Sequence, residues 1–406
     1  MNEDTIAAEF RNGMTDWLLR NDIIKTPQVE AAMRAVSRHL FVPHAPAEEA
    51  YGHDSVVTRR DEAGIAISSA SGPGIVAGML EQLDVRPGHR VLEIGAGTGY
   101  NAALLAHLAG PHGQVTTIDL DQDIVDDARS HLDAAGYGNV TVVQGDGAEG
   151  YLDHAPYDRI AVTAGAWDLP PAWRDQLAPD GRLVVPLRMR GFTRAVAFDR
   201  DGDVLRGRSM FECGFMPMRG PGVVAERNIT VRAGQDPAVI LRIDDGKPAD
   251  ETALGGALAA EPLVTWTGVV VPPGEFEHLD FWLADLDGFC RVLLLDGARA
   301  HGLPTPAYSY GSMGAFEHGT FAYLTRRNAG QADEPEQELG VCACGPSGES
   351  LAGQITARLQ AWNRDLPSVT GLHVDAYPAG AAPGTDGTLL VIRKHHAELH
   401  ACVSAA

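Results

Sequence analysis

The sequence predicts an α/β fold, in which a parallel, doubly wound sheet is followed by an additional C-terminal α+β domain. Short apolar runs alternate with amphipathic stretches between residues 91 and 186, which is the pattern of strands joined by helices. Three glycines at alternate positions stand where the first of these strands meets a helix. Near residue 222 the pattern changes, and glycine and proline then punctuate strand-like runs.

The N-terminal part of the chain is predicted to be helical. Residues 10–20 and 27–36 carry apolar side chains at three- and four-residue spacings, as on the buried face of a helix. We therefore divide the chain into an N-terminal helical part at residues 1–80, a sheet domain at 81–221 and a C-terminal domain at 222–406.

The elements of the sheet domain follow in regular order. Apolar runs predict strands at residues 91–94, 115–119, 140–144, 159–163 and 182–186. Helical spacing predicts helices at residues 101–109, 122–135 and 171–177. Ligands of such sheets bind at the carboxyl ends of the strands, so that edge is where we expect a site.

The C-terminal domain contains strand-like runs and one long amphipathic helix. Strands are predicted at residues 238–243, 263–271, 291–295, 321–325 and 389–393. The helix at residues 348–365 places one row of apolar side chains on a single face, namely Leu351, Ile355, Leu359, Trp362 and Leu366.

Composition and charge exclude several classes of protein. The 406 residues are 45% hydrophobic and 21% charged, which is typical of a soluble globular protein of two to three domains. No apolar run is long enough to span a membrane, and the N-terminus lacks the pattern of a signal peptide. Five scattered cysteines favour reduced thiols and a cytoplasmic location. A net charge of −22 disfavours a nucleic-acid partner.

The glycine cluster Gly95, Gly97 and Gly99 indicates a nucleotide site. Glycine lets a strand turn sharply into a helix and lets a ligand approach bare backbone. Asp119 ends the next strand, at the usual position for binding ribose hydroxyls. A dinucleotide fingerprint requires glycine at position 100, where this chain has Tyr100. The pattern therefore favours the adenosyl end of S-adenosylmethionine over a pyrophosphate.

Several ordered segments between residues 15 and 215 resemble the protein-L-isoaspartate O-methyltransferases. They are residues 29–43, Ala50 to Asp54, the loop 67–77, the glycine motif 91–100, Gly145 to Gly147, residues 155–164 and residues 176–186. Ordinary members of that family end soon after residue 220, whereas this chain continues to 406. In this respect it is similar to the FxLD-system methyltransferases encoded beside lanthipeptide and other ribosomally made peptides.

The resemblance implies a Rossmann-like methyltransferase with S-adenosylmethionine as cofactor, and the residues can be assigned roles. We expect the three glycines to border the methionine part and Asp119 to hold the ribose hydroxyls. Asp146 and Gly147 would meet the adenine edge, and Thr163 would end the fourth strand on the cofactor face. Glu93 would order the glycine turn by accepting backbone N–H bonds. Alternatively, Glu93 and Asp146 are structural caps at strand ends.

A serine-rich loop is expected to contact the substrate. Ser71 would hydrogen-bond the substrate carboxylate, or it would cap the helix that begins near Pro73. Ser68 and Ser69 remain alternatives because the loop has two additional residues upstream. Asp54 matches an acid of the family near this loop, and it could equally serve only to form the turn.

The function expected from these residues is methyl transfer to a side-chain carboxylate of aspartate in a ribosomally made, lanthipeptide-like peptide. The ester would close to a succinimide and open to isoaspartate. The alternative is repair of isoaspartyl residues in aged proteins. A third possibility is a module that binds S-adenosylmethionine without turnover, and an NAD-dependent oxidoreductase is disfavoured by Tyr100. The 222–406 domain would bind the precursor peptide.

Other conspicuous residues are expected to be structural. Cys342 and Cys344 are predicted to be two buried thiols on one face of a strand. The tryptophans at positions 266, 282 and 362 are assigned to the core of the C-terminal domain. No metal site is expected, at His395, His396 and His400 or elsewhere, and residues 275–280 are expected to form a solvated rim.

Overall fold

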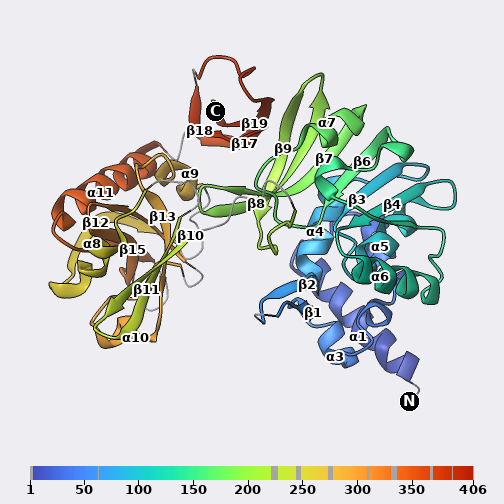
Figure 1. The fold of residues 1–406 in the computed structure, drawn as a ribbon, viewed down its shortest axis with the longest axis horizontal. Coiled ribbons are helices and arrows are strands. Elements are labelled where there is room, and N and C mark those ends of the chain that lie inside the picture. The colour runs from blue at the N-terminus through green and yellow to red at the C-terminus, as the bar shows by residue number, and fades with distance from the viewer. Residues whose placement is uncertain are drawn as a thin grey trace.

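The structure is a computed structural model. It describes residues 3–62, 64–220, 227–243, 248–272, 278–308, 311–330, 336–365, 369–385 and 387–405. Within them the strands form a ten-stranded sheet, a seven-stranded sheet and a two-stranded hairpin (Figure 1). None of the described helices combines the length and the apolar character needed to cross a bilayer.

The ten-stranded sheet contains the predicted parallel strands. These are β3 (Arg90–Ile94), β4 (Gln114–Asp119), β5 (Thr141–Gln144), β6 (Tyr157–Val162) and β7 (Leu177–Met189). They lie in the order β5-β4-β3-β6-β7, so the connections reverse direction between β3 and β6. The predicted doubly wound sheet is thereby confirmed. β7 is longer than the predicted strand 182–186, because it continues into the antiparallel strands β8 (Phe192–Asp201) and β9 (Val204–Glu212).

Helices cover this sheet and build the N-terminal part. They are α1 (Glu3–Arg20), α2 (Pro27–Ala35), η1 (Arg38–Phe41), α3 (Ala47–Ala50), α4 (Pro73–Leu83), α5 (Tyr100–Ala109), α6 (Gln122–Ala134), η2 (Gly147–Glu149), η3 (Leu152–His154) and α7 (Pro171–Gln176). The hairpin of β1 (Val56–Arg60) and β2 (Ala66–Ala70) stands between α3 and α4. Alternate residues of β3 belong to different buried clusters, Val91 with α4 and α5 and Leu92 with α7. Both faces of the sheet are therefore buried, as in other parallel sheets.

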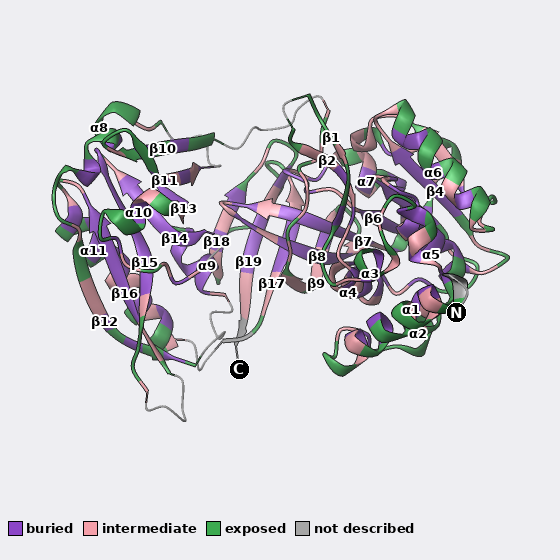
Figure 2. Cartoon of the chain, turned by 90° about the horizontal axis from the view of Figure 1, so that it is seen from below, coloured by how far each residue is buried: buried purple, intermediate pink, exposed green. Residues whose placement is uncertain are grey.

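The second lobe contains an antiparallel sheet in the order β10-β11-β13-β14-β15-β16-β12. Its strands are β10 (Arg227–Ala233), β11 (Asp236–Ile243), β12 (Leu263–Val271), β13 (Phe289–Leu294), β14 (Ser312–Glu317), β15 (Thr320–Asn328) and β16 (Gln337–Cys344). Its helices are α8 (Glu251–Gly255), η4 (Ala257–Ala259), α9 (Leu279–Leu283), α10 (Asp296–Ala300) and α11 (Gly348–Asp365). Figure 2 shows buried residues along the strands of both sheets.

Several structural predictions for this lobe are confirmed. The apolar row on α11 is buried from Leu351 to Trp362, and Leu366 lies outside the described residues. Cys342 and Cys344 are buried on the same face of β16. Trp282 and Trp362 belong to the core, whereas Trp266 is only half-buried beneath the guanidinium of Arg327.

The last strands of the chain do not join the second lobe, contrary to the predicted continuous domain at 222–406. β17 (Val369–Pro378), β18 (Thr388–Arg393) and β19 (Ala397–Ala405) extend the first sheet beyond β9. Asp375 accepts hydrogen bonds from Arg206 Nη1 at 2.7 Å and from the N–H of Gly207 at 3.0 Å. The open edge of β9 has unpaired backbone groups that any strand could pair with. Tertiary packing therefore decides which strand pairs with β9, and the local sequence pattern of the strands does not.

A buried ion pair joins the two lobes. Arg194 on β8 pairs with Asp280 on α9, and both are less than one-tenth exposed. The rings of Phe192 and Phe281 pack edge to face beside them, 4.8 Å apart between centroids. Asp280 was expected on a solvated rim, and that expectation is wrong. Residues 275–277 of the same run lie outside the described residues.

We predict that Asp280→Ala lowers the free energy of unfolding by about 3–5 kcal/mol, because the buried guanidinium of Arg194 then loses its buried carboxylate partner. Chemical denaturation measures this change. The matched control is Asp285→Ala, which breaks the exposed pair with Arg358 and should cost less than about 1 kcal/mol. Equal losses in the two variants would contradict the role assigned to the buried pair.

Candidate functional site

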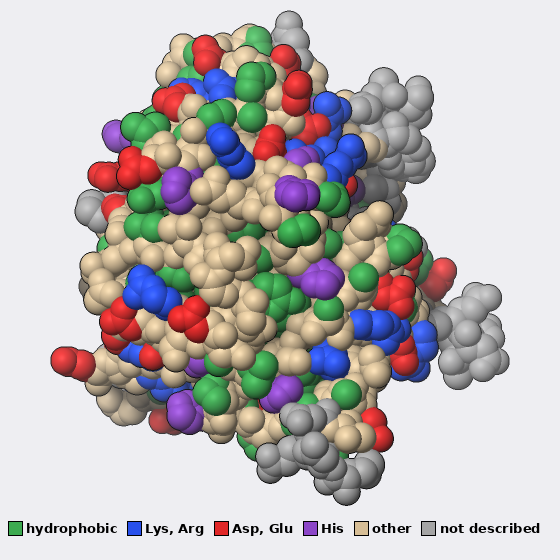
Figure 3. All heavy atoms as spheres, turned by 90° about the vertical axis from the view of Figure 1, so that its right-hand side faces the viewer, with side chains coloured by type: hydrophobic (Ala, Val, Ile, Leu, Met, Phe, Trp, Pro, Cys, Tyr) green, Lys and Arg blue, Asp and Glu red, His purple; other side chains and the backbone are tan. Residues whose placement is uncertain are grey.

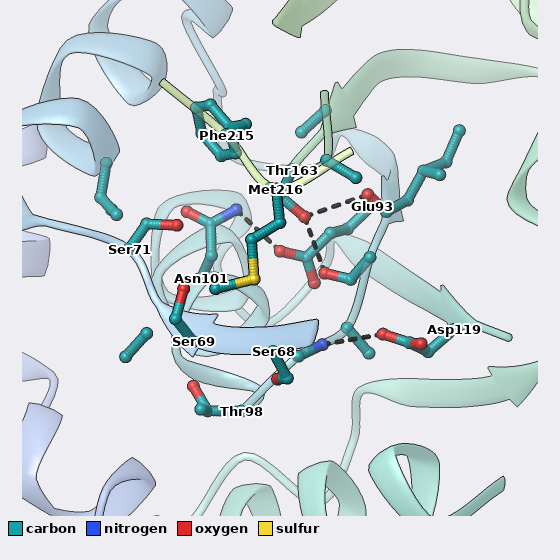
Figure 4. Close-up of a pocket in the computed structure, with 18 of the residues that line it drawn as sticks. Ser68, Ser69, Ser71, Glu93, Thr98, Asn101, Asp119, Thr163, Phe215 and Met216 are labelled. Atoms are coloured by element: carbon teal, nitrogen blue, oxygen red, sulfur yellow. Dashed lines mark hydrogen bonds between the residues drawn. The ribbon is translucent and has the colours of Figure 1, made fainter. Parts of the chain in front are cut away.

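A cavity of about 490 Å³ opens at the carboxyl ends of β3, β4 and β6 (Figure 4). It lies where the connections from β3 and to β6 run to opposite sides, which is the position that ligands favour in open α/β sheets. The glycine loop after β3 forms its floor, and the serines of β2 form one wall. The cavity therefore lies at the edge of the sheet where a site was expected from the sequence.

The glycine loop is held against two neighbouring strands. The N–H groups of Gly95 and Ala96 donate to the carbonyl of Ile118 at 2.8 and 3.1 Å, and the hydroxyl of Thr163 donates to the carbonyl of Gly95 at 2.7 Å. Gly95 has a φ of 104°, and a Cβ there would lie 2.7 Å from the Thr163 hydroxyl. Only glycine fits this turn. Thr163 thus holds the loop and also lines the cavity.

Asp119 connects the end of β4 to the glycine loop. Its carboxylate accepts the N–H of Gly97 at 3.0 Å and that of Leu120 at 2.9 Å. The side chain is half-buried and lines the cavity. A carboxylate has about four acceptor positions, so two hydroxyls of a ribose could still be bound. The free acceptor positions of Asp119 fit the sugar of S-adenosylmethionine, and the bare backbone around Gly97 fits its methionine part.

Glu93 is fully buried directly behind the loop. It accepts hydrogen bonds from the Thr117 hydroxyl at 2.6 Å and from the Asn101 amide at 2.8 Å. The expectation that it accepts backbone N–H groups is therefore wrong, because side chains of β4 and α5 supply the donors. Burial raises the pKa of Glu93 to about 7, although these hydrogen bonds oppose the shift. Asn101 also lines the cavity and was missed in the sequence.

The Asp146–Gly147 turn, expected from the sequence to meet the adenine edge, follows β5 beside the cavity. Asp146 Oδ1 accepts the N–H of Ala148 at 2.9 Å, so this side chain caps η2, which is the structural alternative considered for it. Gly147, rather than Asp146, lines the cavity. The carbonyl of Gly147 accepts the indole N–H of Trp173 at 2.8 Å, which fixes the turn.

All three candidate serines border the cavity (Figure 4). Ser68 is largely buried, and its hydroxyl accepts a hydrogen bond from Thr58 at 3.1 Å. Ser69 and Ser71 are half-buried. Pro73 begins α4, but the residue that precedes the helix is Gly72, which makes no side-chain cap. Ser71 is therefore not the N-cap, and that structural alternative is wrong.

Arg38 positions the backbone of the serine loop and was missed in the sequence. Its buried guanidinium donates to the carbonyls of Ala50 at 2.6 Å and Ser71 at 2.8 Å, and it lies 4.9 Å from the centre of the Tyr100 ring. Burial lowers the pKa of Arg38. Donation from a buried cation to carbonyls on both sides fixes the position of the loop, because displacing the loop removes hydrogen-bond partners of a charge that is costly to bury.

Asp54 stands at the rim of the site. Its side chain is exposed, and Ser55 rather than Asp54 lines the cavity. The backbone before it packs tightly on the serine loop, since a Cβ on Gly72 would lie 2.9 Å from the carbonyl of His53. This placement agrees with a turn-forming residue beside the loop.

A segment at residues 214–219 roofs the cavity and was also missed in the sequence. The N–H of Gly165 donates to the carbonyl of Met216 at 2.8 Å, and the N–H of Met218 donates to Gly165 at 2.9 Å. Phe215 and Met216 face the cavity in Figure 4. Arg219 pairs with Asp121 at the start of α6. In the sequence, only the apolar run Phe-Met-Pro-Met at residues 215–218 could have indicated that this segment contacts a site.

Comparisons with known proteins agree with this geometry. Residues 9–221 match the family model described as protein-L-isoaspartate(D-aspartate) O-methyltransferase. The chain is 38% identical over 221 residues to a protein-L-isoaspartate O-methyltransferase of Methanopyrus kandleri, covering 54% of this chain and 95% of that protein. It is 41% identical over 189 residues to the one of Methanococcoides burtonii, covering 47% and 90%.

A solved structure of a protein-L-isoaspartate O-methyltransferase resembles this chain over nearly its whole length. The likeness covers 98% of this chain and 99% of that one, with a TM-score of 0.50 and 19% sequence identity. At this identity the likeness concerns the fold alone. The solved structure therefore has a counterpart of the second lobe as well.

We predict that Glu93 makes stability depend on pH. The folded protein keeps this proton up to a pH of about 7, whereas the unfolded chain loses it near 4.5, so stability falls as the pH rises between these values. Glu93→Gln carries no charge and removes this contribution, which amounts to about 3 kcal/mol. Unfolding of both proteins at pH 5 and pH 8 isolates the difference, and a difference independent of pH would contradict the shifted pKa.

Proposed function

The chain belongs to the protein-L-isoaspartate(D-aspartate) O-methyltransferase family, and we propose that it methylates the α-carboxylate of isoaspartyl residues in peptides and proteins. It is a carboxyl O-methyltransferase that uses S-adenosylmethionine. The observation that carries the proposal is a single cavity bordered by the glycine loop, Asp119 and the serine loop of Ser71. The substrate expected from the sequence was another one, aspartate in a ribosomally made peptide, whereas the family relatives favour isoaspartate.

The cofactor would lie along the carboxyl ends of the strands. Asp119 would accept the ribose hydroxyls, Gly147 would approach the adenine, and Gly97 would leave room for the methionine part. When bound, S-adenosylmethionine supplies a methyl group on a positively charged sulfur, which a carboxylate oxygen can displace. All of these residues lie at the carboxyl edge of the sheet, where a ligand site was expected from the sequence.

Methyl transfer to a carboxylate requires no general base, so the residues of the chain need only align the substrate. A carboxylate is already ionised at neutral pH. Ser71 would donate its hydroxyl to the substrate carboxylate, while Arg38 keeps the loop in place. Phe215 and Met216 in the roof would exclude water from the reacting groups. Alignment and water exclusion are the contributions that an active site makes to such a displacement.

The product then reacts without further help from the enzyme. The ester is a better electrophile than the carboxylate, so the amide nitrogen of the following residue attacks it, methanol leaves and a succinimide forms. Water opens this ring to aspartate or isoaspartate. Repeated cycles would convert isoaspartate to aspartate, which is the sense of a repair reaction.

A second candidate substrate is aspartate in a modified, ribosomally made peptide. The family model ends at residue 221, and the additional residues to 406 favour a larger substrate surface. The resemblance of the extended chain to the FxLD-system methyltransferases points in the same direction. The extension by itself does not separate the two substrates, because a solved protein-L-isoaspartate O-methyltransferase has a similar fold over its whole length.

We predict that the purified chain adds a methyl group to an isoaspartyl peptide at least about tenfold faster than to the aspartyl peptide of the same sequence. The two peptides differ by the position of one methylene group, a difference that a shaped site distinguishes by roughly this factor. Mass spectrometry of linear and cyclised pairs measures the methylated and dehydrated products. Faster reaction of a cyclised aspartyl peptide would replace the proposed substrate with the second candidate.

We predict that Ser71→Ala lowers kcat/KM by about tenfold or more, since one hydrogen bond to the reacting group is lost. Calorimetry with S-adenosylmethionine should show unchanged cofactor binding. Ser68→Ala and Ser69→Ala, on the strand that ends just before Ser71, are matched variants, and both should retain more activity. If the largest loss occurs in Ser69→Ala, Ser71 is not the substrate contact.

A further inference from the structure

Three potential metal ligands from distant parts of the sequence meet beside the first sheet. Asp168 lies on the loop that follows β6, and His395 and His396 form the turn between β18 and β19. One ligand atom from each residue lies within 4.8 Å of the other two. The N–H of His396 donates to Asp168 Oδ2 at 2.7 Å, which joins the two segments through the backbone.

The hydrogen-bonded nitrogens of the two imidazoles are spaced as two ligands on a common ion would be. His395 Nδ1 lies 3.1 Å from His396 Nε2. Metal–nitrogen bonds of about 2.1 Å place two neighbouring ligand atoms roughly 3.0–3.4 Å apart. Asp168 is oriented as well, because Oδ1 accepts the N–H of Leu169 at 2.8 Å. Each carboxylate oxygen keeps a further acceptor position for an ion.

We propose that Asp168, His395 and His396 bind one divalent transition-metal ion of the Zn²⁺, Ni²⁺ or Co²⁺ class. Imidazole and carboxylate ligands without a thiolate favour these ions. Both histidines are exposed and Asp168 is half-buried, so water would complete the coordination. Two cationic groups lie close to this cluster, over the ring of Trp167. Arg188 is 4.7 Å and Lys394 is 4.9 Å from the centre of that ring. These charges lower the affinity for a cation, and the carboxylate opposes them.

The ion would fasten the C-terminal strands to the loop that carries the cavity roof. Gly165 lies three residues before Asp168 and binds Met216 and Met218 of the roof through its backbone. The site is therefore structural, and it links the β18–β19 turn to the edge of the cofactor cavity. His400 does not contribute, because it is buried and bonded to Glu398 at 2.9 Å.

The test uses the full chain without an affinity tag, stripped with a chelator and titrated with Zn²⁺ and Ni²⁺ in a calorimeter. We expect one ion per chain, and at least about tenfold weaker binding in Asp168→Asn, His395→Asn and His396→Asn. His373→Asn is the control and should bind like the unchanged protein, because this half-buried imidazole bonds the carbonyl of Gly371 in its own strand. Zn²⁺ should also raise the Tm of the unchanged protein by more than that of Asp168→Asn.

Asp168→Asn distinguishes a three-ligand site from adventitious metal binding by the two neighbouring surface histidines alone. Full affinity in this variant, with losses only in the histidine variants, would overturn the three-ligand site. Absence of binding to the unchanged chain would overturn it too. Melting curves without metal show whether each variant folds, so a loss of affinity in a folded Asp168→Asn supports the proposal.

Discussion

The turn that follows β3 is the constraint on which the rest of the site depends. The chain must pass from the central strand into α5 within a few residues, and it does so with glycines in left-handed conformations. Ile118 and Thr163 hold this turn from the two neighbouring strands. Because the register of β3 with β4 and β6 is parallel, the ends of all three strands meet there. Because the glycines of this turn have no side chains, the space that larger residues would fill stays open, and this space is the cavity.

Buried charges are used to place segments relative to one another. Arg38 keeps the serine loop against α3, and the Arg194–Asp280 pair keeps the second lobe against β8. Glu93 ties α5 to β4 and keeps its proton to a higher pH than usual. Such groups are costly to bury, and each therefore tolerates only the geometry that satisfies it. On the face in Figure 3, in contrast, acidic and basic side chains of the described residues are interspersed.

The second lobe is integrated with the methyltransferase part. One buried cluster runs from Trp173 and Val185 of the first sheet region to Leu351 and Trp362 of α11. The chain then returns, and β17 to β19 complete the first sheet. A chain cut at residue 221 would lose both this apolar contact and the partner of the β9 edge. The lobe is consequently part of the architecture that supports the first sheet and its cavity.

The sequence by itself determined the elements and the edge of the sheet that carries the site. Apolar periodicity and the glycine turn are local signals, so β3 to β6, α11 and the positions of Gly95 and Asp119 could be predicted from them. Only the tertiary structure decided which distant segments meet: the roof at 214–219, the return of β17 to β9, and Asp168 beside His396. The physical reason is that these contacts depend on the complementarity of surfaces far apart in the chain, which leaves no periodic trace in either segment.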